Sequence, residues 1–407
     1  MNKLWGIQGQ IGSWKKSMRL IGLKGLMGFM GLLGLLGMGF GSCTPEPPLH
    51  LYDAQEAMIE LSVVDLDFES YWGTVMDLNT NMEIESNWYY GWDAVDVATH
   101  GEIGYTLPTV FEVRRYYTGE VPYAKHTGVI RDTIHGNSFQ GMYDWGFWDM
   151  MLWNEIDAKD GVQSIIIDEN STLDSVFAYT NATMRSTRYN APRFTHAFNA
   201  PEPLLVVYEQ GIEINKNLDG FVFDEERNAW VRTLKMTLRP VTYIYLTQVI
   251  LHNNRGRISS IDGNADLSGM ARSTNMNTGR AGDDAITVFF NVNFKKDRDK
   301  DGEKVDIIGG RVLTFGICGL QANKISSPSE VKDAHRHYMD FTMQFNNGMD
   351  STFVFDVTDQ IREKYRGGII TIELDVDTIP IPTRSGGSGF DAVVKDTEDG
   401  GTYEFDM

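Results

Sequence analysis

Apolar and polar residues alternate along many short stretches of this chain, and this alternation limits the fold more than any other feature. In IITIELDV, Ile370, Ile372 and Leu374 alternate with Thr371 and Glu373, which predicts a strand with one buried face. The same pattern recurs in MIELSVV, AITVFFNVNF and STFVFDV, at residues 58–64, 285–294 and 351–357. No stretch of helical length has a comparable amphipathic pattern. The sequence therefore predicts an all-β protein.

Turn-forming residues separate the predicted strands, as in NNRGR, DKDGE, FNNGMD and KYRGG. Short strands separated in this way are typical of β-sandwiches. Three prolines interrupt the alternation in RYNAPRFTHAFNAPEP, residues 188–203, and mark the expected domain boundary. We expect an N-terminal sandwich over residues 51–195 and a C-terminal sandwich over residues 201–407.

A Gly/Leu-rich run ends at Cys43, in GLLGLLGMGFGSCTPEPP. The run is too short and too rich in glycine for a stable transmembrane helix, which needs about 20 apolar residues. Basic residues precede the run and no acidic residue does, as in a secretory signal that starts at Met1 or Met18. The motif Phe40-Gly41-Ser42-Cys43 resembles a bacterial lipobox, in which the signal is removed before a cysteine that then carries lipid. The prolines that follow disfavour the alternative, a buried cysteine after an apolar helix.

We therefore expect a lipoprotein signal peptide over residues 1–42, lipidation at Cys43 and a lipid-anchored tether over residues 43–50. Cys318 is then the only remaining cysteine, so no intrachain disulfide can form. It lies in the apolar stretch LTFGICGL and is predicted to be an inert core residue.

The charge of the chain excludes some partners. Without the signal peptide, the chain keeps 31 Lys and Arg residues against 56 Asp and Glu, a net charge near −25. A surface this acidic repels nucleic acid and anionic headgroups, so we expect no nucleic-acid partner. The span from Thr44 to Val113 has 14 acidic residues and no Lys or Arg. It should stand away from the membrane that the lipid binds.

Two segments imitate metal sites. In KKDRDKDGEK, Asp297, Asp299 and Asp301 precede a glycine, like the start of an EF-hand loop, but Ile308 stands where the loop needs a bidentate Glu. A solvated hairpin tip explains this segment better, and we expect no metal and no cofactor. His335 and His337 have a spacing that metals can use, but zinc needs more ligands, so an exposed polar segment is favoured.

Two stretches are rich in aromatic residues. SNWYYGWD contains Trp88, Tyr90 and Trp92, which could stack on sugar rings if they are exposed. The alternative, favoured on general grounds, is that such residues fill cores and seal junctions. The second stretch, YDWGFWDMMLW at residues 143–153, has the pattern of a core strand.

No catalytic motif is present in the sequence: there is no G-x-S-x-G elbow, H-E-x-x-H helix, Walker loop or G-x-G-x-x-G turn. The glycine-rich SGGSGF follows two prolines and opens no helix, so it is expected to be a flexible turn. We therefore do not expect an enzyme.

Several long blocks resemble a family of Bacteroides-type lipoproteins of unknown function. These blocks are LRPVTYIYLTQVI, ADLSGMA, RVLTFGICGL, FVFDVTDQI and IPIPTRSGGSGFDAVVKD, with YTLPTVFEVRRYY and YDWGFWDMMLWNEID further upstream. The chain departs from the family pattern at LWNEID, where only Asn154 and Glu155 keep part of an expected asparagine-rich run. The family is similar to fimbrillins and fimbrial anchor proteins. The resemblance implies two tandem transthyretin-like β-sandwiches with Greek-key topology.

The resemblance also implies a role on the cell surface. It suggests an outer-membrane lipoprotein that acts as a fimbrial anchor or accessory subunit, with other fimbrial subunits as partners through β-strand addition. Polymerising relatives lose an N-terminal strand to an Arg-directed protease, but the span from Thr44 to Val113 offers no Arg or Lys, and Arg114, the next basic residue, lies in a predicted strand. A lipid-anchored module that binds glycans through Trp88, Tyr90 and Trp92 is the alternative.

Overall fold

A computed structural model gives the fold of the chain. All the residues that the structure describes belong to one compact unit, Gln55–Met407. They are residues 64–70, 88–106, 108–118, 128–136, 138–140, 146–156, 158–159, 162–169, 173–181, 197–214, 218–226, 229–236, 238–382, 391–395 and 404–405.

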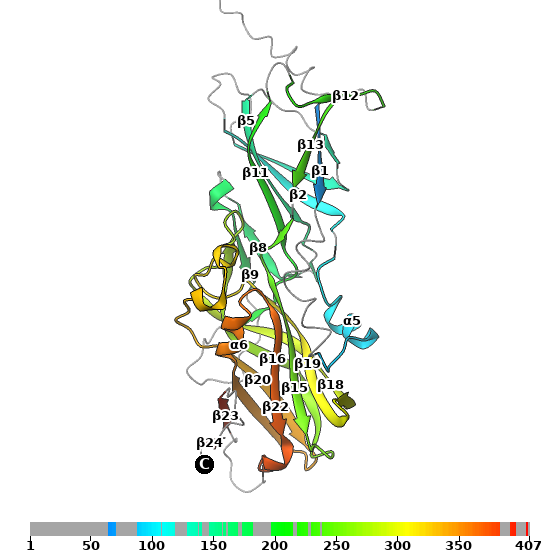
Figure 1. Ribbon diagram of the computed structural model, residues 1–407, viewed down its shortest axis with the longest axis vertical. Helices are drawn as coiled ribbons and strands as arrows, with labels where there is room; N and C mark the ends of the chain where they lie inside the picture. The colour runs from blue at the N-terminus through cyan, green and yellow to red at the C-terminus, as the bar shows by residue number, and fades with distance from the viewer. Residues whose placement is uncertain are drawn as a thin grey trace, which may run out of the picture. The chain divides into compact units, whose positions relative to one another are not determined.

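The described chain is all-β, as the alternation predicts, and its largest sheet has ten strands (Figure 1). Nine of them follow one another in the order β22 (Gly368–Asp375), β15 (Tyr243–His252), β19 (Glu303–Thr314), β18 (Ala285–Lys300), β16 (Ile258–Ala271), β20 (Tyr338–Phe345), β21 (Asp350–Asp356), β23 (Asp391–Lys395) and β24 (Glu404–Phe405). The tenth, β10 (Ala197–Asn199), pairs in parallel with β18.

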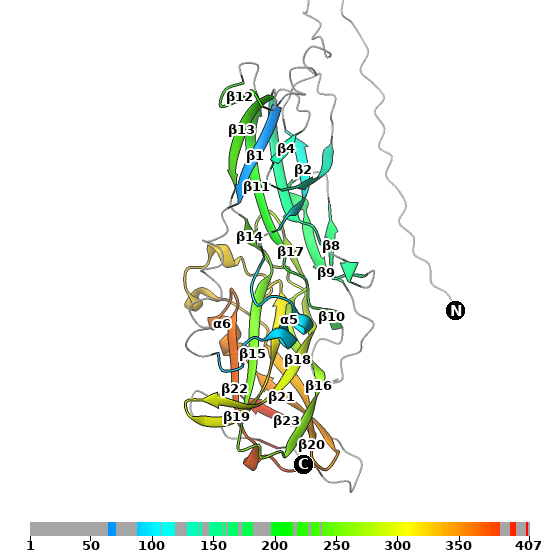
Figure 2. The ribbon, with the colours of Figure 1, turned by 90° about the vertical axis from the view of Figure 1, so that its right-hand side faces the viewer.

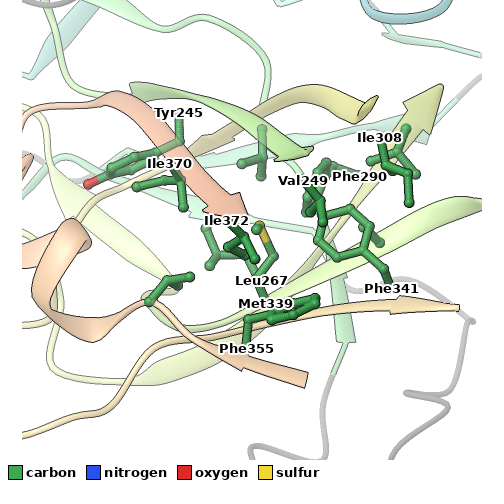
Figure 3. Packing of buried hydrophobic residues seen from close by; sticks show 14 of the residues in the cluster. Tyr245, Val249, Leu267, Phe290, Ile308, Met339, Phe341, Phe355, Ile370 and Ile372 are labelled. Atoms are coloured by element: carbon green, nitrogen blue, oxygen red, sulfur yellow. The ribbon is translucent and has the colours of Figure 1, made fainter. Parts of the chain in front are cut away.

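Strand β18 joins the two halves of this sheet. Its residues 285–291 pair with β16, whereas its residues 292–300 pair with β19. The sheet therefore folds back on itself, and side chains from both halves enclose one hydrophobic core (Figure 3). Tyr245 and Ile370 enter this core from one half, and Leu267, Met339 and Phe355 enter it from the other. Burying each such side chain stabilises the fold by about 1.5 to 3 kcal/mol.

Two smaller sheets form a second sandwich-like unit. The five-stranded sheet has the order β14 (Arg239–Pro240), β11 (Leu205–Ile214), β5 (Gly146–Asn154), β2 (Val110–Tyr117) and β3 (Val129–His135). The four-stranded sheet has the order β12 (Val222–Asp224), β13 (Ala229–Met236), β1 (Val64–Ser70) and β4 (Ser138–Gln140). Trp148 of β5, Ile212 of β11 and Leu234 of β13 belong to one buried cluster, so these sheets share a core.

The other elements are short. A three-stranded sheet contains β17 (Ser273–Asn275), β9 (Phe177–Thr180) and β8 (Ile165–Asp168), and a two-stranded one contains β6 (Ala158–Lys159) and β7 (Val162–Gln163). The helices are α5 (Ala94–His100), α6 (Thr358–Glu363), η1 (Leu173–Ser175), η2 (Ala322–Lys324), η3 (Pro328–Glu330) and η4 (Val376–Thr378). Over the described ranges, no helix has the length and apolar character that a membrane span requires.

The predicted alternation is confirmed in β22, whereas Phe289 of β18 and Val354 of β21 are buried on the faces that the alternation left to solvent. Ile370, Ile372 and Leu374 of β22 are buried, whereas Thr371 is half-buried and Glu373 is exposed. The hairpin predicted at DKDGE is also confirmed: Asp301 and Gly302 both have positive φ, as a two-residue type I′ turn requires. Of the strand expected over residues 58–64, only Val64 lies within the described residues, where it begins β1.

The expected domain division at residues 195–201 remains a prediction. Strands from both sides of it share one sheet, because β11, which follows the division, pairs with β5, which precedes it. Likewise, β13 pairs with β1 over seven positions. Pro201 and Pro203 therefore lie before β11, a strand of the N-terminal sheets, rather than after the last strand of those sheets.

Candidate functional site: the aromatic strap

The candidate stacking residues lie in a segment that crosses the large sheet, residues 88–105, which we call the strap. Figure 2 shows α5 of this segment in front of the large sheet, where it contacts both β18 and β19. Tyr90 packs with Ile250, Val305 and Ile307 in a buried cluster on the outer face of the sheet. The strap therefore covers apolar surface that faces away from the main core.

The aromatic side chains of the strap do not form an open platform. Tyr90 is completely buried, so it is not available for stacking, and the favoured alternative, that these aromatic residues fill a core, describes its surroundings. Trp88 and Trp92 are half-buried and contact Tyr90 edge-on, with ring centroids 5.3 and 6.4 Å away. Tyr90 can be buried here because Gly309 of β19 has no side chain. A Cβ at this position would lie 2.5 Å from the Tyr90 ring, so only glycine leaves room for the ring.

Local sequence explains the path of the strap. Gly91 has φ of 69°, a conformation that favours glycine, and it turns the chain after Tyr90. Asp93 then caps α5, accepting hydrogen bonds from the backbone N–H groups of Val95 and Asp96. The Asp96 side chain bonds back to the Asp93 N–H, which completes a capping box.

Asp96 is the centre of a buried polar cluster. Its carboxylate pairs with Lys295 of β18 at 2.5 Å and accepts hydrogen bonds from the Tyr90 hydroxyl and from Asn293 Nδ2. Lys295 also contacts Asp93 at 2.8 Å and lies over the Tyr90 ring. Burial alone would raise the pKa of Asp96, but these partners outweigh it and hold the pKa at about 2. Asp96 is therefore ionised at neutral pH although it is fully buried.

Side chains of the sheet also bind the main chain of the strap. Gln248 Oε1 accepts hydrogen bonds from the N–H groups of Tyr89 and Tyr90, at 3.1 and 3.3 Å. Arg311 donates to the carbonyl oxygens of His100, Glu102 and Gly104 just after α5. These contacts satisfy backbone groups that a segment without strand partners would otherwise leave unpaired. These carboxylate, amide, hydroxyl and guanidinium contacts bind the strap to the sheet.

Of the aspartates that resemble the start of an EF-hand loop, Asp299 and Asp301 lie at the end of the β18–β19 hairpin, and Asp297 lies where the pairing of β18 is irregular, between Lys295 and Arg298. Asp297, Asp299 and Asp301 are all exposed. Asp299 Oδ1 accepts from the Gly302 N–H, and Asp301 Oδ2 accepts from the Tyr89 hydroxyl. Within the described ranges no group of three or more His, Cys, Asp or Glu side chains could hold a metal ion. The hairpin tip is confirmed, and the absence of a calcium site stays a prediction.

His335 and His337 were expected to lie in an exposed polar segment, and this expectation is wrong for His337. Its side chain is fully buried, with Nε2 2.6 Å from Asp333 and Nδ1 3.3 Å from the Ser268 carbonyl oxygen. Gly269 makes this possible, because a Cβ there would lie 2.8 Å from the ring. Both ring nitrogens thus have hydrogen-bond partners, which a buried histidine needs.

Other predicted residues have the expected surroundings. Cys318 is buried in the core as predicted, and burial raises the pKa of its thiol to about 12. In β5, Trp148 and Trp153 are buried, which confirms that the second aromatic stretch is a core strand. Cys43, the predicted lipidation site, lies outside the described residues.

Asn154 and Glu155 line an open pocket of about 300 Å³ beside the ends of β2, β5 and β11. The Asn154 side chain is engaged in structure: it accepts from the Leu205 N–H at 2.7 Å and donates to the Pro203 carbonyl oxygen at 3.0 Å. This pocket contains none of the predicted aromatic residues.

Sequence analysis missed the residues that bind the strap, namely Gln248, Lys295, Arg311 and the buried Asp96. One feature could have pointed to them: two adjacent glycines, Gly309 and Gly310, interrupt an otherwise apolar strand pattern. Such glycines mark places where another segment approaches the strand closely. Which segment approaches is a long-range fact that the local pattern does not contain.

The fold and this strap define an all-β protein of sandwich-like sheets. No family model matches the chain, and no curated protein matches it. Among solved structures, it is similar to an adhesin candidate from Bacteroides ovatus, with 15% identity, a TM-score of 0.43, and coverage of 79% of this chain and 94% of the other.

The chain is also similar to the fimbrial anchor protein Mfa2 from Porphyromonas gingivalis, with 11% identity and a TM-score of 0.39. That match covers 84% of this chain and 94% of the other. A cell adhesion protein candidate from Bacteroides eggerthii matches at 12% identity and a TM-score of 0.38, over 81% and 90% of the two chains. Likenesses of this size assign no function to the chain.

Proposed function

We propose that this chain is a lipid-anchored protein of the outer cell surface that serves as an anchor or accessory subunit of fimbriae and takes part in their assembly or in adhesion by β-strand addition. The lipobox-like motif at Cys43 and the resemblance of the sequence blocks to fimbrillin-related lipoproteins support the proposal. The observation that carries it is the position of β1, which lies between β13 and β4 inside a sheet.

Strand β1 is the part of the chain that an anchor should retain. It pairs in parallel with β13 over seven residue positions and antiparallel with β4 over three. Removing it would leave main-chain groups of both neighbours unpaired, at about 1 to 3 kcal/mol for each group that stays buried. A subunit that keeps β1 has a closed sheet, whereas one that loses it offers a groove for a strand from another subunit.

The first basic residues after the signal region support retention. No Lys or Arg lies between Lys24 and Arg114, so an Arg-directed protease has no earlier site there. Arg114 is buried in β2, where it forms a two-bond ion pair with Glu169 at 2.6 and 2.9 Å. The next residue, Arg115, is also buried and pairs with Asp132. A protease needs an exposed, extended substrate, which a paired central strand does not provide.

The proposed role needs no catalytic chemistry, and we propose that the chain is not an enzyme. Its partners in this proposal are the outer membrane, through the lipid on Cys43, and other fimbrial subunits. The glycan-binding alternative has less support, because Tyr90 is buried and Trp88 and Trp92 are half-buried in the strap.

The test is N-terminal sequencing of the protein recovered from mature surface assemblies. A start at lipidated Cys43 supports the anchor. A start beyond Ser70 means that β1 is removed and that the chain is a polymerising subunit instead.

The lipid is tested separately with Cys43→Ala, which should abolish lipid labelling and release the protein from the membrane fraction. Cys318→Ala is the control, since its buried thiol cannot carry lipid. Unchanged membrane partition of the Cys43→Ala variant would refute the lipid anchor.

A further inference from the structure

His100 is the last residue of α5 and lies at the point where the strap meets β18 and β19. Its ring is 5.3 Å from the Trp92 ring, and its Cε1 faces Gly310, where a Cβ would lie only 3.3 Å away. The His100 carbonyl oxygen accepts a hydrogen bond from Arg311 at 2.8 Å. The ring is thus half-buried between the strap and the sheet, with little room to move.

The hydrogen-bond network fixes the tautomer of this histidine. Asp96 is ionised and can only accept, so the Asn293 atom 3.0 Å from its Oδ1 must be the amide nitrogen, Nδ2. The same Nδ2 lies 3.2 Å from His100 Nε2. An amide nitrogen donates and does not accept, so Nε2 must carry a lone pair and the ring proton must be on Nδ1. The network therefore requires a neutral imidazole.

The charges around His100 also bear on its protonation. Lys295 of β18 and Arg311 of β19 are positive, while Asp96 and Asp93 of the strap are negative. Burial lowers the pKa of His100 to about 4, with Arg311 and Lys295 adding to the effect and Asp96 opposing it. Protonation would place an N–H on Nε2 against the Asn293 N–H, so two donors would face each other.

We propose that the strap is an acid-sensitive latch, in which protonation of His100 breaks its contact with Asn293 and releases the strap from β18 and β19. Release uncovers the apolar outer face formed by Ile250, Val305 and Ile307. The latch depends only on contacts among described residues and not on the proposed fimbrial role.

The direction and size of the pH effect follow from linkage. Since the pKa of His100 is lower in the closed latch than the usual 6.5, the latch is fully stable above pH 6.5 and weakens as pH falls toward 4. The open state then gains on the order of tenfold in population between pH 7 and pH 5. Asp96 does not cancel this effect, because its pKa of about 2 keeps it charged throughout this range.

The experiment is amide hydrogen exchange on the full chain at pH 7 and pH 5, corrected for the intrinsic pH dependence of exchange. The Tyr89 and Tyr90 amides, which donate hydrogen bonds to Gln248 Oε1, report on the strap. We expect their protection to fall on the order of tenfold at pH 5, while the β15 amides of the core stay protected. In His100→Gln, the strap amides should keep the same protection at both values. His252→Gln, which changes a histidine outside the strap, should behave like the wild type.

A second measurement keeps the test valid if the variant does not fold. The ring protons of His100 in the wild type should titrate well below the usual pH 6.5, and strap protection should fall over the interval from pH 6.5 down to about 4. Strap protection that is unchanged between pH 7 and pH 4 would overturn the latch. So would a His100→Gln variant whose strap opens in acid as much as the wild type.

Discussion

The chain contains two aromatic stretches of similar composition that are buried in different ways. In β5, Trp148 is buried because its strand pairs with β2 and β11 on its two sides and its side chain lies in the core that the two N-terminal sheets share. In the strap, Tyr90 is equally buried, but its backbone has no strand partner and is bound by side chains of the sheet. Aromatic-rich stretches of similar composition are thus buried in two ways. One is a core strand bonded to its neighbours through the main chain, and the other is a segment that side chains of the sheet bind.

These two regions differ in how they respond to change. Paired strands are bonded through main-chain groups that every residue has. Substitutions therefore destabilise them mainly by changing the volume of core side chains. The strap depends on a few particular side chains, so single polar substitutions should release it. Both expectations can be tested with variants that affect only one of the two regions.

The largest effect is expected in β5. Trp148→Ala should lower the free energy of unfolding by about 3 to 5 kcal/mol, because it removes a fully buried ring from the core between the two N-terminal sheets. Urea unfolding measures the change. The control is Phe147→Ala on the same strand, where the side chain is 48% exposed and the loss should be under about 1 kcal/mol. Equal losses in both variants would contradict the assignment of β5 as a core strand.

The next effect is in the strap. Asp96→Asn should destabilise the protein by about 3 kcal/mol at pH 7, because it leaves the Lys295 ammonium without its buried partner. The control is Asp93→Asn, which contacts the same lysine from a half-exposed position and keeps a good helix cap, so it should cost less than about 1 kcal/mol.

The difference between wild type and Asp96→Asn should depend on pH. Because the pKa of Asp96 in the folded state is about 2, below its usual value, the advantage of the wild type is complete above about pH 4 and is lost as pH falls through 2. Urea unfolding at pH 6, 4 and 2.5 measures it. A difference that stays constant across these values would show that the carboxylate charge is not what stabilises the strap.

The fold could be predicted from the sequence further than the site could. Alternation and turn residues correctly indicated strands such as β22 and the Asp301-Gly302 hairpin, because these patterns are local. The pairing of β11 with β5 across the prolines was not predictable, since it depends on long-range partner choice. For the same reason, the sequence showed an aromatic cluster at Trp88, Tyr90 and Trp92 but not the sheet that buries it. His337 was mistaken for an exposed residue because its partner, Asp333, is an ordinary acidic residue in the sequence.

Glycine at position 309 offers a smaller test of the strap. In Gly309→Ala, the added Cβ would lie 2.5 Å from the Tyr90 ring and 2.7 Å from the Thr247 carbonyl oxygen. Tyr90 should be displaced, at a cost of about 1 to 3 kcal/mol, and strap amides should exchange faster. Gly263→Ala is the matched control in the same sheet, because nothing lies within 4 Å of its Cβ position. Unchanged strap exchange in Gly309→Ala would mean that close approach of Tyr90 is not required.

The smallest effect separates the two tryptophans of the strap. Trp92 Nε1 donates to the Gly101 carbonyl oxygen at 3.2 Å, whereas Trp88 Nε1 is buried and has no hydrogen-bond partner within the described part of the chain. Trp92→Phe should therefore destabilise the protein by about 1 kcal/mol through the lost hydrogen bond, in addition to the smaller ring. Trp88→Phe loses a similar ring area but relieves an unpaired donor, so it should cost less or even stabilise. Urea unfolding of the two variants side by side decides the matter. A larger loss for Trp88→Phe would mean that ring packing, rather than hydrogen bonding, sets the stability of the strap, and the contrast with β5 would then disappear.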